Sequence, residues 1–222
     1  MAGLGWDIAV CYRTSEEDAK IAITAIESCG SSALALRADV SQPADCTALF
    51  DQVLAWRGQI DALIHCAGPF HRVNVLDETP EGWRAMFANN LDSLFFLSRL
   101  VAPSMMERRW GRILAFSMAN ADRLMAQTQI TAHYLAKASV LGLVRSLAKA
   151  LAPYQITANA ISPGFIDSGS VDLSELMHMT KSIPAGSVGT VDDIVAAALY
   201  LLSDEASYVN GANLQVSGGW GI

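Results

Sequence analysis

A histidine, a tyrosine and a lysine lie close together in the segment His133-Tyr134-Leu135-Ala136-Lys137. The apolar spacing from about Ile130 to Ala152 predicts one long helix that contains this segment. Positions four apart, such as His133 and Lys137, share a face of a helix, and so do Tyr134 and Lys137, which are three apart. An imidazole or a phenol beside an ammonium group can exchange a proton with a bound molecule near neutral pH. The segment therefore predicts an acid–base site.

The elements around this helix alternate between strand-like and helix-like patterns. This alternation predicts a Rossmann-like, doubly wound α/β fold, with a parallel sheet and helices on both faces, and we expect one domain over residues 1–222. In such sheets, ligands bind beyond the carboxyl ends of the strands. The candidates for binding are therefore the residues directly after predicted strands, namely Arg13, Asp39, Ala67, Gly68, Ser117, Pro163 and Gly164.

Composition excludes several other classes of protein. The net charge is −7 and no basic cluster exceeds Arg108-Arg109, so we expect no nucleic-acid surface. No apolar run is long enough to cross a membrane and no signal peptide is visible, so we expect a cytoplasmic protein that does not bind membranes. The four cysteines have no paired spacing, which predicts free thiols. The four histidines share no ligand spacing, so we expect no metal site.

The helix with Lys137, the strand Gln155–Ile161 and the turn Pro163-Gly164 resemble those of the short-chain dehydrogenase/reductase family. The resemblance runs from about Trp6 to Ile222 and is nearest to members that reduce 3-oxoacyl carrier-protein thioesters or pteridines. It implies an oxidoreductase that prefers NADP, with NAD possible, and that reduces a carbonyl or oxidises an alcohol of a small-molecule substrate by hydride transfer.

The resemblance also assigns cofactor contacts. Arg13 and Ser15 stand where NADP-preferring members place a base and a hydroxyl against the 2′-phosphate, although Arg13 also suits a solvated turn. Asp39 and Val40 match a pair beside the adenine, and Asp39 equally suits a helix cap. The other positions matched to the family's cofactor site are Ala67, Gly68, Asn90, Lys137, Pro163, Gly164, Ile166 and Ser168.

The catalytic positions depart from the family pattern. The family has a tyrosine four residues before the lysine, but here that position is His133, and Tyr134 is one residue late. Three alternatives stay open: His133 is the proton donor, Tyr134 takes the role after a local shift of the helix, or the site is inactive. Asn90 matches an asparagine that helps to hold a water beside the lysine.

The serine that orients the substrate oxygen in the family is also displaced. Its position aligns best with Met118, so Ser117, which is adjacent, is the candidate, with Asp122 as a further one. The long connection from Ser162 to Thr190 predicts a binding loop with a short helix at about Leu173 to Thr180.

The front of the chain shows a second departure. The family's first strand, glycine-rich turn and helix hold the cofactor pyrophosphate, and nothing before Asp7 supplies them. The missing strand would lie in the middle of the sheet. Either the chain is N-terminally shortened, or it is genuinely short and the neighbouring strands close up or borrow a partner.

These departures motivate a second hypothesis, an impaired or inactive family member that acts as a binding or assembly subunit. The helices at about 81–109 and 130–152 correspond to those that commonly form interfaces in the family. From this resemblance we expect a homodimer or homotetramer.

Overall fold

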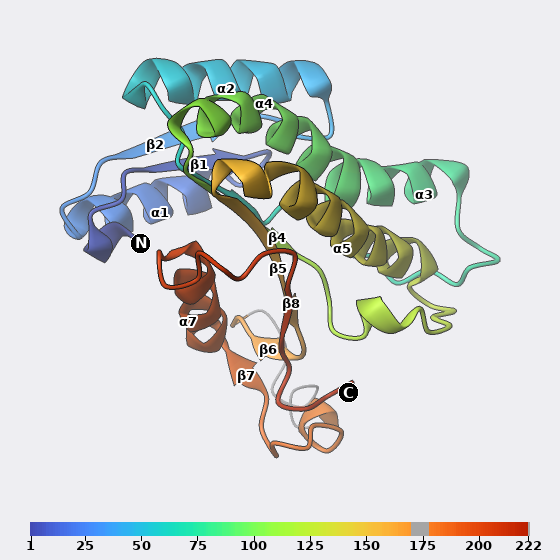
Figure 1. Ribbon diagram of the computed structural model, residues 1–222. Coiled ribbons are helices and arrows are strands. Elements are labelled where there is room, and N and C mark those ends of the chain that lie inside the picture. The colour runs from blue at the N-terminus through green and yellow to red at the C-terminus, as the bar shows by residue number, and fades with distance from the viewer. Residues whose placement is uncertain (170–177, 222) are drawn as a thin grey trace.

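A computed structural model describes residues 1–169 and 178–221 of the chain (Figure 1). Strands and helices alternate, as the sequence predicts. The first half contains β1 (Ile8–Tyr12), α1 (Glu16–Ser28), β2 (Ala33–Arg37), α2 (Pro43–Arg57), β3 (Ala62–His65) and α3 (Pro80–Phe87). The second half contains α4 (Ser93–Arg108), β4 (Gly111–Phe116), α5 (Thr131–Leu151), β5 (Ile156–Pro163), β6 (Ile166–Asp167), β7 (Gly189–Thr190), α7 (Val191–Leu202) and β8 (Asn213–Val216).

The segment predicted as one helix from Pro80 to about Arg109 is two α-helices. A π-helical turn, Ala88–Asp92, separates α3 from α4, and Pro103 lies inside α4. A π turn adds one residue to a helical turn, so it rotates the following helix without breaking the chain of hydrogen bonds. It carries Asn90, whose side chain is fully buried.

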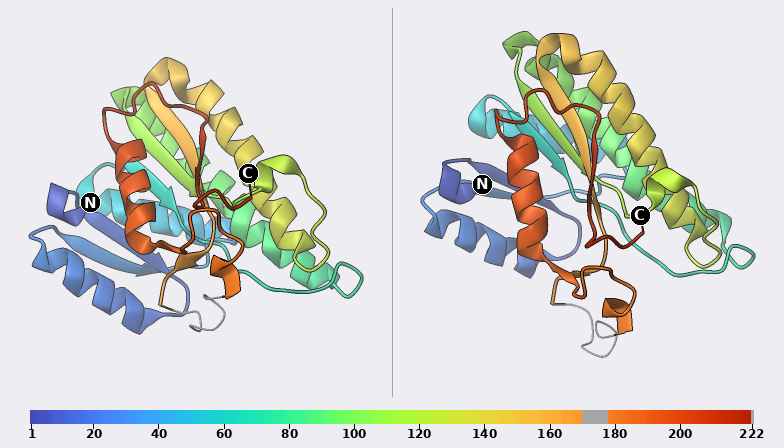
Figure 2. Two further views of the ribbon diagram at one scale, coloured as in Figure 1. Left: turned by 90° about the horizontal axis from the view of Figure 1, so that it is seen from below. Right: turned by 60° about the horizontal axis from the view of Figure 1, so that its bottom comes forward.

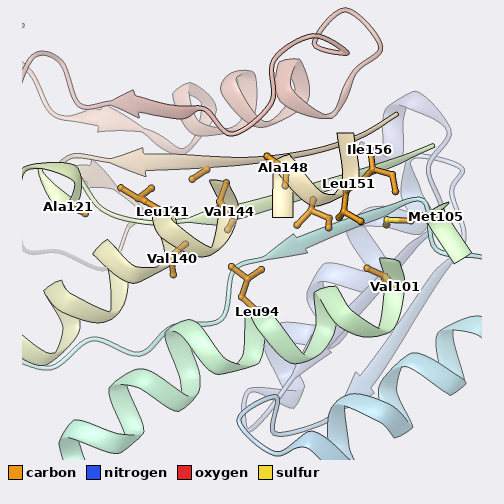
Figure 3. Packing of buried hydrophobic residues seen from close by; sticks show 14 residues of the cluster. Leu94, Val101, Met105, Ala121, Val140, Leu141, Val144, Ala148, Leu151 and Ile156 are labelled. Carbon is orange, nitrogen blue, oxygen red and sulfur yellow. The ribbon is translucent and has the colours of Figure 1, made fainter. Parts of the chain in front are cut away.

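Helices cover both faces of the strands. Figure 1 shows α2, α4 and α5 on one face, and Figure 2 shows α1 and α7 on the other. The largest apolar cluster lies between α4, α5 and the strands β4 and β5 (Figure 3). Val140, Val144 and Leu151 recur along one side of α5 and are buried there, which explains why this segment folds as a helix on the sheet.

The main strands form two separate sheets, and the short strands β6 and β7 form a third, where the resemblance predicts one sheet with a missing strand. β1 pairs only with β2, while β3, β4, β5 and β8 form a four-stranded parallel sheet in that order. A cavity of about 1250 Å³ lies between β1 and β3 and is lined by residues of both strands. The two strands do not close up, so the backbone groups on their facing edges have no ladder partner within residues 1–169 and 178–221.

The β1–β2 unit is attached to the larger sheet by other contacts. Leu97 of α4 packs into a cluster with Cys46 and Leu49 of α2. At the amino end of β1, Asp7 forms an ion pair with Arg57 at 2.8 Å. At its carboxyl end, the Arg13 guanidinium donates to the Asn89 side-chain oxygen at 3.3 Å. These contacts hold the two sheets on opposite sides of the cavity.

The described helices include none that is both long enough and apolar enough to cross a membrane.

The divided sheet predicts an uneven pattern of amide hydrogen exchange. Successive N–H groups of a strand point to opposite edges, so about half of the amides of β3 face the cavity instead of β4. We expect these amides to exchange much faster than those of β5, which is paired on both sides by β4 and β8. Residue-resolved NMR exchange measures this difference. Equal protection along all of β3 would show that its free edge is paired in solution.

Candidate active site

The ammonium group of Lys137 is the centre of the candidate site. It is buried under the carboxyl end of β4, where Nζ donates a hydrogen bond to the Phe116 carbonyl oxygen at 2.9 Å. Burial lowers the pKa of Lys137 to about 8, because the charged form loses hydration. The lysine is therefore close to its titration range at neutral pH, which is typical of groups that take part in proton exchange.

His133 lies one helical turn before Lys137 on the same face of α5. Its Nδ1 atom is 3.2 Å from the Pro69 carbonyl oxygen, and the Phe70 ring meets the imidazole edge-on with centroids 5.1 Å apart. Burial, and then the positive charge of Lys137, lower the pKa of His133 to about 4. The imidazole is therefore neutral at pH 7.

The Tyr134 side chain is engaged elsewhere. It is 1% exposed, and its hydroxyl donates to the Asn120 carbonyl oxygen at 2.6 Å. The same hydroxyl accepts from the Met125 N–H at 2.8 Å. These two hydrogen bonds hold the connection between β4 and α5 against the start of α5. The Tyr134 hydroxyl therefore stabilises this connection.

The Ser117 hydroxyl is also bound to the backbone. It is buried and donates to the Lys137 carbonyl oxygen at 2.8 Å, which ties the end of β4 to α5. The alternative candidate, Asp122, is exposed and accepts from the Gln215 side-chain amide at 3.3 Å. Neither side chain has a hydrogen bond to Lys137 Nζ or to His133.

The Asn90 amide and Gly68 complete the site around Lys137. Asn90 Nδ2 donates to the carbonyl oxygens of Pro69 and Met86 at 3.2 and 3.0 Å, but its Oδ1 atom has no partner among the described residues. A Cβ atom placed on Gly68 would come within 2.3 Å of that oxygen and 2.9 Å of Lys137 Nζ. An acceptor and a cationic donor therefore converge over a glycine, and a side chain there would fill the space between them.

A second group of candidates lies across the cavity, at the carboxyl ends of β1 and β2. Arg13 is 4.0 Å from the Asp39 carboxylate. Asp39 also accepts from the Ser41 hydroxyl and N–H, and the hydroxyl bond is the main cause of its lowered pKa. Asp39 therefore caps the turn that precedes α2 and not α2 itself, because the helix begins at Pro43 and its N-cap residue, Gln42, has an extended backbone. Ser15 precedes α1 without a side-chain capping bond, and Val40 packs beside the cluster around Leu97.

The third group follows β5. The Gly164 N–H donates to the Val216 carbonyl oxygen at 2.9 Å, and a Cβ there would lie 2.8 Å from the Ser217 Cα atom. Pro163 is the last residue of β5, and Ile166 lies in β6, which pairs with β7. Ser168 is next to the end of this described segment. The predicted helix from about Leu173 to Thr180 falls largely within 170–177, outside the described residues, and 178–180 are helical.

Sequence reasoning missed the groups on the loop after β3. The Pro69 carbonyl holds both Asn90 and His133, and Phe70 packs on His133. The next residue, His71, pairs with Glu78 at 2.7 Å. A further histidine, His65 of β3, is a buried core residue, and its Nε2 atom bonds the buried Ser93 hydroxyl at 2.7 Å. A backbone carbonyl leaves no side-chain signal, so the role of Pro69 was not visible in the sequence.

The fold and the site together define a Rossmann-like α/β protein with a lysine-centred site at the carboxyl edge of its sheet. The family described as enoyl-(acyl carrier protein) reductase matches residues 1–221. The chain therefore belongs to the short-chain dehydrogenase/reductase family.

Individual relatives agree with this membership. Nodulation protein G of Azospirillum brasilense is 36% identical over 82% of this chain and 74% of its own length. A 3-oxoacyl-[acyl-carrier-protein] reductase, FabG, of Staphylococcus aureus (strain Mu50) is 33% identical over 99% of this chain and 89% of its own length. A blue fluorescent protein from a metagenomic library, solved in complex with NADPH, has a TM-score of 0.90 at 27% identity and covers 100% of this chain and 90% of its own.

The contacts of Tyr134 predict that its hydroxyl supports stability. Tyr134→Phe leaves the Met125 N–H and the Asn120 carbonyl without this partner, which costs about 1–3 kcal/mol in the free energy of unfolding. Urea denaturation measures the loss, and Tyr208→Phe is the control because Tyr208 is fully exposed. If Tyr134→Phe unfolds at the same urea concentration as the parent, the hydroxyl does not hold this connection.

Proposed function

We propose that the protein is an NADP-preferring oxidoreductase that exchanges a hydride between nicotinamide and a small alcohol or carbonyl compound. The observation that carries the proposal is the convergence of Asn90 Oδ1 and Lys137 Nζ over Gly68, with His133 on the same face of α5. A substrate oxygen beside these groups would meet a cation, a polar amide and a proton-exchanging imidazole. The reductase relatives and the NADPH-bound structural neighbour support the same reaction class.

The residues fit two ends of a dinucleotide. Gly68 leaves a space next to Lys137 that a side chain would fill, and this space suits a ribose. The Lys137 ammonium group has further N–H donors for the ribose beyond its bond to the Phe116 carbonyl. Arg13 and Ser15 would hold a 2′-phosphate, with Asp39 and Val40 beside the adenine.

The nicotinamide end has its own set of residues. The family positions that would hold it are Ala67, Gly68, Asn90, Lys137, Pro163, Gly164, Ile166 and Ser168. The nicotinamide ring, when bound, supplies hydride exchange with the substrate carbon.

The chain's own residues would divide the remaining work. Lys137 would bind the ribose and stabilise negative charge that develops on the substrate oxygen. Asn90 would accept a hydrogen bond from a water or hydroxyl beside Lys137, because its Oδ1 atom is buried without a partner. His133 would exchange the proton. We assign Tyr134 and Ser117 to support of the loop and of α5, since their hydroxyls already bond the backbone.

The divided sheet favours a second candidate, a binding or assembly subunit without catalysis. The pyrophosphate of a dinucleotide would pass between the two groups of residues, where the described chain has a cavity and no glycine-rich turn. For either function we propose a cytoplasmic homodimer or homotetramer that uses α4 and α5. The exposed Phe95 ring on α4 supports this assembly.

Titration of NADPH by isothermal calorimetry, followed by NADPH oxidation with a 3-oxoacyl thioester at 340 nm, tests the proposal. We expect binding, and we expect Lys137→Gln to lower turnover by about 100-fold or more. Lys149→Gln is the matched control, since Lys149 is exposed on the same helix. No binding at millimolar NADPH or NADH would contradict the oxidoreductase and leave the assembly subunit.

Arg13 predicts the preference between the two nucleotides. Arg13→Ala removes the cation proposed for the 2′-phosphate, so the dissociation constant for NADPH should rise about tenfold while that for NADH stays the same. Arg84→Ala, which removes an exposed cation on α3, is the control. An equal rise in the dissociation constants for NADPH and NADH would mean that Arg13 does not bind the 2′-phosphate.

A further inference from the structure

We propose that His133 offers an unprotonated Nε2 atom to the substrate and acts as a general base, so that the site binds and deprotonates an alcohol. This inference rests on the proposed function, because the hydride needs the nicotinamide as its acceptor. It goes further by naming the atom that takes the proton and the pH dependence that each direction of the reaction should show.

The Pro69 carbonyl decides which ring nitrogen carries the proton. A carbonyl oxygen can only accept, so His133 Nδ1, 3.2 Å away, must be the donor. The neutral ring therefore has its one proton on Nδ1 and a free electron pair on Nε2. Nε2 has no hydrogen-bond partner among the described residues, and so it is available to a ligand.

Two further contacts keep the ring in this state. Asn90 Nδ2 donates to the same Pro69 oxygen at 3.2 Å, which holds the carbonyl in place. Phe70 meets the imidazole edge-on at an interplanar angle of 88°, which limits its rotation. Because Pro69 and Phe70 are consecutive, the loop after β3 positions both the hydrogen bond and the ring plane.

The charges around His133 disfavour its protonated form. Lys137, on the same helix, and His71, on the loop after β3, are the titratable groups whose charge acts on it, and both oppose a positive imidazole. The nearest carboxylate on that loop, Glu78, is paired with His71 at 2.7 Å. No described carboxylate bonds either nitrogen of His133, and the hydrogen bond to the Pro69 carbonyl, which favours an imidazolium, is outweighed by burial and by Lys137.

The proton step balances for an alcohol substrate. The substrate O–H bond breaks and an N–H bond forms at Nε2, while the electron pair left on oxygen becomes the second bond of the carbonyl. The hydride leaves the same carbon for the oxidised nicotinamide, which is thereby reduced. The resulting imidazolium, repelled by Lys137, returns its proton to solvent. In the reverse direction, the His133 imidazole must first be protonated, which its lowered pKa disfavours.

Nitrogen-15 NMR of the histidine rings, in the protein without nucleotide or substrate, tests the inference independently of activity. We expect the His133 signals, assigned by their loss in His133→Gln, to show a proton on Nδ1 and none on Nε2 from pH 7 to 5. Protonation should occur only near pH 4, the pKa that burial and Lys137 impose. A proton on Nε2, or an imidazolium at pH 6.5, would overturn the proposal.

Activity measurements then separate this inference from the proposed function. With a 3-hydroxyacyl thioester and its 3-oxoacyl partner, kcat/KM for reduction should fall about tenfold per pH unit above pH 5 while oxidation does not. His133→Tyr supplies a phenol that is protonated at neutral pH, so its kcat/KM for reduction should no longer fall between pH 5 and pH 8. His178→Gln, an exposed control, should keep the fall seen in the parent protein.

Each outcome of these measurements has one meaning. If NADPH binds and the thioesters turn over, but reduction shows no fall with pH, His133 is not the base and the proposed function stands. If no nucleotide binds, the proposed function fails, and with it the alcohol oxidation inferred here.

Discussion

The buried ammonium group of Lys137 is the constraint on which the rest of the site depends. A cation in this position loses hydration, and its bond to the Phe116 carbonyl returns only part of that stabilisation. The groups around the ammonium therefore have to include a polar one, which is the Asn90 Oδ1 atom, left without a partner among the described residues. The backbone that carries the lysine also has to be held rigidly. Ser117 supplies the rigidity by bonding the Lys137 carbonyl, so the same lysine is held at its backbone and at its side chain.

The same cation explains why a histidine at position 133 behaves differently from a phenol. A phenol keeps its proton at neutral pH and is made more acidic by a nearby positive charge, so it can give that proton up. An imidazole beside Lys137 loses its second proton instead and becomes an acceptor. Under the proposed assignment, a histidine at this position would change the proton chemistry of the site while α5 keeps its packing on the sheet.

The helix and strand at the centre of the molecule could be predicted closely, because their signals are local. Buried apolar residues at helical spacing marked α5 to within a residue or two, and the turn Pro163-Gly164 marked the end of β5. The π turn at Ala88–Asp92 was missed, since one extra residue in a turn leaves the apolar pattern nearly unchanged. The partner of His133 lies 64 residues away in sequence. The Pro69 and Asn120 groups that bond His133 and Tyr134 are backbone carbonyls, which carry no residue-type signal.

Titration of Lys137 shows whether its ammonium group is buried in solution. In protein labelled with carbon-13 at the lysine Cε atoms, we expect one signal that titrates near pH 8 and disappears in Lys137→Gln. Lys20, which donates hydrogen bonds to the carboxylates of Glu17 and Glu16, should titrate above its ordinary pKa in the same experiment. If instead the Lys137 signal titrates near the ordinary lysine pKa of about 10.4, its ammonium is solvated, and the buried, lysine-centred site described here does not exist.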